Sequence, residues 1–355
     1  MSLTVALLAL AAAVLVALLL HGWWSVRQAS PRRAQPQPGD SRVEPELGES
    51  MGGEALSDVG GEGASVVPTD AEPVALPLVR RAACLDALID AVAPLALEAP
   101  VSAEVVLAHL PASRRAGSKP MHIEGLDAES GQWEVPTPGR LYTELQAGVQ
   151  LTNRSGALNE IEYSEFVQKV EAFAEGVGAM ADFPDMLEVV ARARELDEFA
   201  SPLDAQITLT LQANAVPWSV GYVVQCAGRH GFVPGVLPGR LVVPAPEEGA
   251  PPVLVLGFDP QAALADDPQA AALREVVLSL DVPQTPRASE PYAQWYQAAT
   301  ALAADLDATP VDDAGRPVTL GAFDAIGRQL AELYQALESR DLAAGSPAAR
   351  RLFSG

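Results

Sequence analysis

Residues 206–211 read Gln-Ile-Thr-Leu-Thr-Leu, so polar and apolar side chains alternate without a break. A period of two residues predicts a strand with one buried face and one open face. Residues 217–230 follow with apolar side chains at helical spacing, and Gly231 comes directly after them, as expected of a residue that ends a helix. A strand followed at once by a helix indicates an α+β unit rather than an all-β or all-α fold.

The pattern continues as far as residue 340. Short apolar runs bounded by Pro and Gly predict further strands, and two Ala- and Leu-rich stretches with one apolar stripe predict helices. The expected strands are 237–243, 253–258, 275–282 and a short one near 309–318, and the expected helices are 292–306 and 320–340. For residues 201–340 this order predicts an α+β unit whose sheet has its helices on one face.

Residues 79–200 follow a similar plan with weaker signals. The expected strands are 85–97, 121–135 and 141–151, and the expected helices are 102–109, 160–180 and 184–199. Because strand, helix, strands and two helices recur in the same order, we interpret 79–200 as an α+β domain and a degenerate copy of 201–340, duplicated in tandem. An unrelated α+β domain is the alternative. Residues 341–355 are expected to form a flexible tail.

The first residues have the character of a membrane anchor. Residues 3–20 are apolar except for Thr4, and as a helix they would span about 27 Å, close to the hydrocarbon thickness of a bilayer. Two tryptophans at 23 and 24 and three arginines by residue 33 follow, and no basic residue precedes the run. These features predict a single transmembrane helix over 1–24, which contacts the lipid bilayer through residues 3–24, with the body of the chain in the cytoplasm. A cleaved signal peptide is the alternative, but it requires a basic start and a small-residue cleavage site.

Residues 25–78 have the composition of a disordered linker. They hold seven prolines and seven glycines, and between 34 and 78 nine acidic side chains face a single basic one. Such a segment cannot bury enough apolar surface to offset the entropy of its chain. The whole protein has 46 acidic and 23 basic side chains and a net charge of −23, which argues against general binding of nucleic acid.

Motifs that carry catalysis or hold metals are missing from the sequence. Cys84 and Cys226 are too few for a four-cysteine zinc site, and Cys226 and His230, four residues apart on one predicted helix, have no third ligand nearby. The chain has no G-x-S-x-G, Walker A or H-E-x-x-H motif. We therefore predict no catalytic, cofactor-binding or metal-binding residues and expect a protein that is not an enzyme.

Three stretches, taken together, resemble the ZipA family of bacterial cell-division proteins. Residues 18–27, Leu-Leu-Leu-His-Gly-Trp-Trp-Ser-Val-Arg, are similar to the end of that family's membrane anchor. Residues 224–232 resemble its first helix, which ends in Gly-Phe. Residues 282–333 resemble its Val-Pro strand end, Ala-rich helix, strand with Asp-Asp and last helix that starts with Thr. The likeness covers about residues 1–27 and 203–340.

The resemblance implies a split β-α-β (ferredoxin-like) fold for residues 203–340, with an antiparallel sheet and its helices on one face. It also implies a protein that ties FtsZ to the bacterial inner membrane at the future septum. It would be a single-pass protein with its N-terminus in the periplasm and its C-terminal domains in the cytoplasm. The helix-free sheet face of residues 201–340 would bind the C-terminal tail of FtsZ, mainly through apolar contacts. The sequence leaves self-association open.

On this chain the binding face should comprise alternate residues of the expected strands. If Ile207, Leu209 and Leu211 face the core, the residues between them face the partner, and a shift of one residue would invert every assignment. The resulting candidates are Thr208 and Thr210 on the first strand, Leu237 and Leu241 on the second, Val255 on the third, and Val277 and Ser279 on the fourth. Several are Thr or Ser, where the family tends to have large apolar side chains. The alternative is therefore a membrane-anchored scaffold of the same fold that binds a different division or envelope protein.

Overall fold

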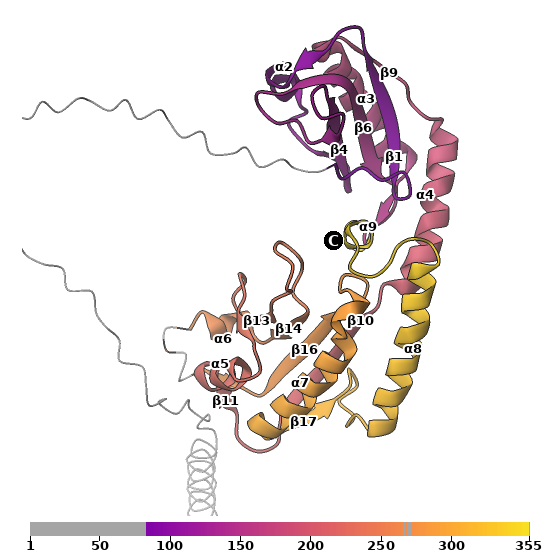
Figure 1. Cartoon of the computed structure of the whole chain (residues 1–355). Coiled ribbons are helices and arrows are strands. Elements are labelled where there is room, and N and C mark those ends of the chain that lie inside the picture. Colours follow the sequence, from indigo (N-terminus) through magenta and orange to yellow (C-terminus); the bar gives the residue numbers. More distant parts are fainter. Residues whose placement is uncertain (1–82, 266, 268–270, 355) are drawn as a thin grey trace, which may run out of the picture.

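The computed structural model describes residues 83–265, 267 and 271–354, and it contains two large antiparallel β-sheets with helices packed against them (Figure 1). The α+β class that the sequence predicts is therefore confirmed. We call residues 83–203 unit 1, residues 204–338 unit 2, and residues 339–354 the C-terminal segment.

The membrane helix predicted over 1–24 and the linker predicted over 25–78 lie outside the described residues. Within the part of the chain that the structure does describe, no helix is both long and apolar enough to cross a membrane.

The main sheet of unit 1 has the strand order β3-β4-β6-β1-β9, in which neighbouring strands are antiparallel, and β7 and β8 form a separate two-stranded sheet. Local signals fix its longest helix: the Asn159 side chain accepts hydrogen bonds from the N–H groups of Ile161 and Glu162, and Gly178 ends the helix at φ 70°. The elements are β1 (Asp90–Leu97), β2 (Val101–Ser102), α2 (Ala103–His109), β3 (Arg115–Ala116), β4 (Lys119–Asp127), β5 (Trp133–Glu134), β6 (Leu141–Gln150), β7 (Thr152–Asn153), β8 (Gly156–Ala157), α3 (Glu160–Val177), β9 (Ala179–Ala181) and α4 (Met186–Ala200).

Unit 2 has a sheet with the strand order β12-β13-β14-β16-β10-β17. Its helix α7 packs on β10, β16 and β17. The Trp295 side chain of that helix is buried, with its ring 5.9 Å from that of Phe323 on α8. The elements are η1 (Ser201–Leu203), which precedes the unit, β10 (Gln206–Ala213), β11 (Trp218–Ser219), α5 (Val220–Gly228), β12 (Val233–Pro234), β13 (Arg240–Val243), β14 (Leu254–Gly257), α6 (Pro260–Ala263), β15 (Ala272–Leu273), β16 (Glu275–Asp281), η2 (Arg287–Ser289), α7 (Pro291–Leu306), β17 (Ala308–Val311) and α8 (Leu320–Glu338).

The two units share one connectivity. A strand, a helix, two strands, a second helix and a last strand follow in that order, and the four strands take the same places, β4-β6-β1-β9 in unit 1 and β14-β16-β10-β17 in unit 2. Helices α3 and α7 both end in a left-handed residue, Gly178 and Asp307, and the next residue begins β9 or β17. The first residue of β9 pairs with Leu97 and the first residue of β17 pairs with Ala213, so positions in the two sheets can be matched one to one.

Most expected elements exist, and the differences in unit 1 have local causes. The helix expected over 160–180 ends at Val177, because Gly178 turns the chain and residues 179–181 form β9. The strand expected over 85–97 begins only at Asp90, because the N–H of Ile89 bonds back to the carbonyl oxygen of Asp86 in a turn. In unit 2 the second expected strand, 237–243, begins at Arg240.

The C-terminal segment is not a flexible tail, so the prediction for 341–355 is wrong over the described residues 341–354. It forms helix α9 (Pro347–Leu352), and its apolar side chains Leu342, Leu352 and Phe353 are buried. The segment lies between the two units (Figure 1). The side-chain amide of Gln150 in unit 1 donates to the Arg351 carbonyl oxygen, and that of Gln284 in unit 2 donates to the Phe353 carbonyl oxygen, at 2.8 and 2.7 Å. The C-terminal segment therefore lies between the two units and joins them by these hydrogen bonds.

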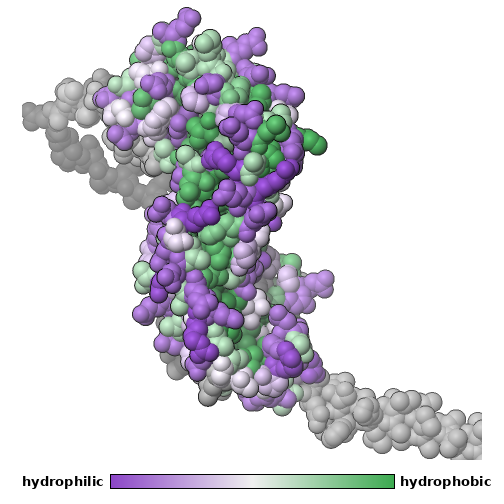
Figure 2. Space-filling view, turned by 90° about the vertical axis from the view of Figure 1, so that its right-hand side faces the viewer, coloured by the Kyte–Doolittle hydropathy of each residue, from purple (hydrophilic) through white to green (hydrophobic). Residues whose placement is uncertain are grey.

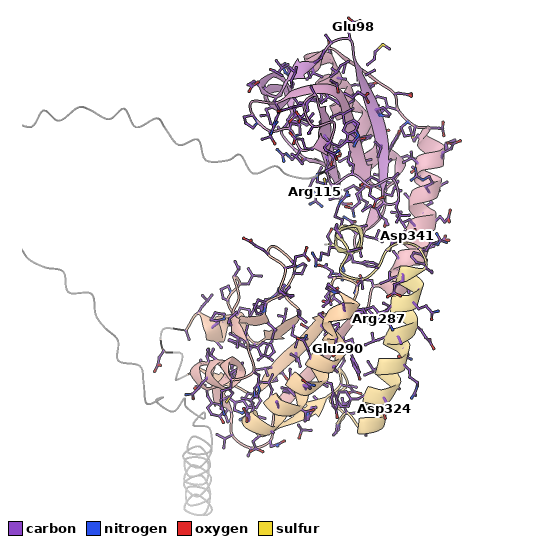
Figure 3. The ribbon with its side chains drawn as sticks, viewed as in Figure 1. Glu98, Arg115, Arg287, Glu290, Asp324 and Asp341 are labelled. Atoms are coloured by element: carbon purple, nitrogen blue, oxygen red, sulfur yellow. The ribbon has the colours of Figure 1, made fainter. Side chains whose placement is uncertain are left out.

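The molecule is elongated, with α4 and α8 following one another along one side (Figure 1). Glu98 and Asp324 mark its opposite ends (Figure 3). Figure 2 views the side that carries these two helices, and it shows apolar residues in a band along the middle, between hydrophilic residues. At the junction the Arg340 guanidinium lies 4.8 Å above the ring of Phe199.

Candidate functional site

The helix-free face of the unit 2 sheet, which we call the open face, is defined by the alternation along β10 and β16. Leu209 and Leu211 of β10 are buried on the helix side, while Thr208 and Thr210 are on the other side and at least partly exposed. The β10–β16 register pairs Thr208 with Ser279 and Thr210 with Val277, so these four residues share the open face. The orientation that the sequence predicts for these strands is confirmed.

Two cross-strand rows extend this face over four strands. In one row Val242 of β13 pairs with Val255 of β14, which pairs with Ser279. In the other, Arg240 of β13 pairs with Gly257, which pairs with Val277. The Val242, Val255 and Val277 side chains are all partly exposed. They are the branched apolar side chains that the two rows offer to a ligand.

Two of the seven candidate residues are not on this face, so their predicted placement is wrong. Leu241 is only 3% exposed and pairs with the buried Leu256, which puts it in the core between the sheet and the helices. Leu237 precedes β13 in an exposed turn. The apolar run around these residues has no polar alternation, so no pattern in it distinguishes the two possible registers. Val242 takes the place assigned to Leu241.

The surface above the two rows is hollowed. Two adjoining hollows of about 430 and 540 Å³ share Arg240, Gly257 and Val277 in their walls. Val255 and Ser279 line the first of them. Thr208 instead faces a separate groove of about 640 Å³ between β10 and α8. The candidates on β14 and β16 therefore lie together, and those on β10 lie at the border of the hollowed area.

One end of the open face is charged, and part of that charge comes from unit 1. The Arg154 guanidinium, from the turn between β7 and β8, lies 2.7 Å from Asp204 and 2.8 Å from Asp281. Burial raises the pKa of Asp281, and the hydrogen bond from Arg154 opposes that rise. The sequence could not reveal this contact, because nothing in the pattern around Arg154 points to a strand end more than a hundred residues away.

The geometry of the open face suits an extended peptide. A flat, partly apolar sheet surface with a hollow can hold alternate side chains of such a segment. Among the described residues no group of three or more His, Cys, Asp and Glu side chains could hold a metal ion. Cys226 is fully buried, and the His230 Nε2 atom lies 2.9 Å from an Asp305 oxygen.

Cys84 is the other cysteine, and its environment disfavours the thiolate. Burial raises its pKa to about 12, and the nearby Glu124 carboxylate adds to the effect. At pH 8 about one molecule in ten thousand would carry the thiolate, against roughly a quarter for a thiol of ordinary pKa. We expect alkylation of Cys84 by iodoacetamide at pH 8, followed by mass spectrometry, to be more than a hundredfold slower than in the urea-unfolded chain. Equal rates in the two states would contradict this environment.

Comparison with known proteins adds no relative: no protein-family model matches this chain, and no curated protein sequence matches it.

Proposed function

We propose that this chain is a non-enzymatic, membrane-anchored protein that binds the C-terminal tail of FtsZ on the open face of unit 2. It would thereby tie FtsZ to the bacterial inner membrane during cell division, with the N-terminus in the periplasm and both units in the cytoplasm. The observation that carries the proposal is the helix-free sheet face that holds Val242, Val255 and Val277, with two adjoining hollows lined by Val255 and Val277. The resemblance of residues 203–340 to the ZipA family supports the choice of partner.

Two further features fit a tether. The apolar run 3–20 would anchor the chain in the membrane, and the 54 residues from 25 to 78 would connect the two units to it by a long acidic linker. We also infer that units 1 and 2 are tandem copies of one split β-α-β fold, since four strands and two helices of each unit share one connectivity. Only unit 2 would carry the FtsZ site.

The area of apolar contact sets the expected strength. Burying three partly exposed valines contributes about 2–4 kcal/mol in gross terms, well short of what large Leu or Phe side chains would give. We therefore expect binding in the micromolar range or weaker, which suits a filament that offers many copies of the tail at once.

The test is binding of a fluorescein-labelled peptide of the FtsZ C-terminal tail to the full chain in detergent, followed by fluorescence anisotropy. Val277→Asp should weaken binding at least tenfold, because it places a charge in the wall shared by both hollows. Ala331→Asp is the matched control, because Ala331 is exposed on α8 and should leave binding unchanged. No binding by the wild-type chain, with its fold intact by circular dichroism, would refute FtsZ as the partner.

One observation favours the second candidate, a membrane-anchored scaffold for a different division or envelope protein. Apart from the three valines, the two rows of the open face hold Thr, Ser, Gly and Arg240, and Arg154 and Asp281 close one end. Such a surface prefers a ligand with polar side chains among its apolar ones. If the wild-type chain does not bind the FtsZ peptide but binds another division protein, and Val277→Asp weakens that binding, the result would favour the scaffold over the FtsZ tether.

A further inference from the structure

The outer edge of the unit 1 sheet is interrupted. Strand β3 pairs with β4 at Lys119 and Pro120, and β5 pairs with it at Gly125 and Leu126. In the described part of the chain no strand pairs with the outer side of residues 122–124. Both β3 and β5 are antiparallel to β4, so they are collinear pieces of one edge strand whose middle is missing. We call this stretch the edge gap.

Backbone groups of β4 point into the edge gap. The N–H of Met121 donates to the carbonyl oxygen of Arg114, and the N–H of Asp127 donates to that of Gln132, both on the outer side of β4. Backbone groups alternate between the two sides of a strand, so the N–H and C=O of Ile123 also face outward. An added strand would form a hydrogen-bonded pair with Ile123.

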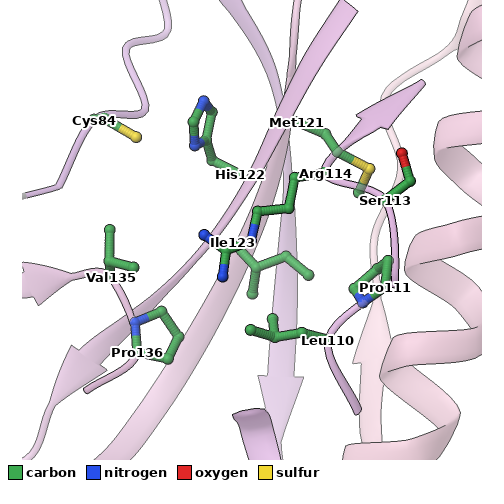
Figure 4. A pocket seen from close by; sticks show the side chains of 10 residues that line it. All are labelled: Cys84, Leu110, Pro111, Ser113, Arg114, Met121, His122, Ile123, Val135 and Pro136. Carbon is green, nitrogen blue, oxygen red and sulfur yellow. The ribbon is translucent and has the colours of Figure 1, made fainter. Parts of the chain in front are cut away.

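The edge gap opens into a hollow of about 290 Å³ (Figure 4). Four segments line the hollow, and most of the lining side chains are apolar, among them Leu110, Ile123, Val135 and Pro136. In Figure 4 the Arg114 and His122 side chains project into the same space. The hollow has room for about two or three residues in extended conformation, the same length as the edge gap.

Unit 2 shows what fills this place when a strand is present. When the two sheets are matched position by position, Ile123 corresponds to Leu256. Ile123 pairs with Ala147, which pairs with β1, and Leu256 pairs with Leu278, which pairs with β10 at the matching position. In unit 2 the outer neighbour of Leu256 is Leu241 of β13, whose side chain is buried. The edge gap of unit 1 is therefore the position that β13 occupies in unit 2.

The charge around the edge gap is opposite to that of the chain. The net charge of the protein is −23, yet the hollow is lined by no carboxylate and does contain Arg114. His122 also lines it, but burial lowers the pKa of its imidazole, so the positive charge in the hollow is that of Arg114. Arg115, the exposed first residue of β3, follows at the end of unit 1 that faces unit 2 (Figure 3). The nearest acid on β4, Glu124, is buried and accepts hydrogen bonds from the backbone of Leu85 and the side chain of Gln146. Acidic side chains on a bound segment would thus meet positive charge.

We propose that the edge gap of unit 1 binds a short acidic segment of a partner protein, which adds to the sheet as an antiparallel strand. An apolar residue of the segment lies opposite Ile123, with its side chain among Leu110 and Ile123, as Leu241 lies in unit 2. Acidic residues on either side of it lie near Arg114 and His122. Main-chain hydrogen bonds provide the attachment, and the apolar residue and the charges provide the selectivity.

The first test uses peptides and leaves the protein unchanged. The probe is fluorescein-Gly-Asp-Leu-Val-Asp-amide, titrated with the full chain in detergent and followed by anisotropy. N-methylation of the leucine amide removes the N–H that would bond to the Ile123 carbonyl oxygen, and it should reduce affinity at least tenfold. N-methylation of the valine amide, which would point away from β4, is the matched control and should have little effect. Equal binding of all three peptides, or no binding at 1 mM, would overturn the proposal.

The second test locates the binding site and separates the contribution of charge to binding from that of the main-chain hydrogen bonds. Arg114→Gln should weaken the acidic probe about five- to tenfold and leave its Asn-Leu-Val-Asn counterpart unchanged, whereas Arg328→Gln on α8 should change neither. Hydrogen exchange of the Ile123 amide, fast in the free chain, should slow when the probe is bound. Binding without protection of Ile123, or equal loss for the acidic and neutral peptides, would show that the segment does not add at this edge.

Discussion

Replacement of Arg351 by Ala is expected to destabilise the folded chain by about 3–5 kcal/mol. The Arg351 guanidinium binds both oxygens of Asp90, at 2.8 and 2.6 Å, and also bonds to the carbonyl oxygen of Cys84. The Asp90 side chain is fully buried, so removal of its cation leaves an unpaired carboxylate in the interior. The pair joins the C-terminal segment to the first strand of unit 1, and its loss should also loosen the packing between the units.

Urea unfolding followed by far-UV circular dichroism measures this effect. Arg328→Ala is the control, because Arg328 is exposed on α8, and exposed substitutions of this kind change the free energy of unfolding by about 0.5 kcal/mol or less. Adding Asp90→Asn to Arg351→Ala should recover part of the loss, since the remaining buried group is then neutral. A loss of stability in Arg351→Ala no larger than that in Arg328→Ala would show that the Arg351–Asp90 pair does not stabilise the attachment of the C-terminal segment to unit 1.

The sequence predicts those parts of the fold in which alternation or helical spacing is strong. In β10 and β16, apolar residues such as Leu209 and Leu278 alternate with polar or smaller ones, and their orientation follows directly. The four residues of β13 read Arg-Leu-Val-Val, a pattern that fits either register. Strand β9 has only three residues and directly follows α3, so the pattern of the sequence assigns its first residues to the helix expected over 160–180.

Contacts between distant segments could not be predicted. The burial of Leu352 and Phe353 depends on the two units meeting around them, which no local pattern near the C-terminus encodes. The same holds for Arg154, which completes the charged end of the open face from the other unit. The edge gap of unit 1 becomes visible only when the pairing of β4 is known, because residues 122–124 resemble any strand interior.

The register of β13 predicts opposite results for two neighbouring substitutions. Leu241 is 3% exposed and faces the helices, so Leu241→Asp would bury a carboxylate without a partner and should cost at least about 4 kcal/mol of stability. Val242 is partly exposed on the open face, so Val242→Asp should cost less than about 1 kcal/mol. Urea unfolding measures both.

The same pair of variants connects the register to the proposed function. Val242→Asp should leave the fold intact and weaken the FtsZ peptide, because Val242 pairs with Val255 in the row that faces the partner. A change in peptide binding by Leu241→Asp would follow from unfolding and should vanish when the assay is restricted to its folded fraction. If Leu241→Asp were tolerated and Val242→Asp unfolded the chain, β13 would be shifted by one residue, and the partner would meet Leu241, the residue first expected there.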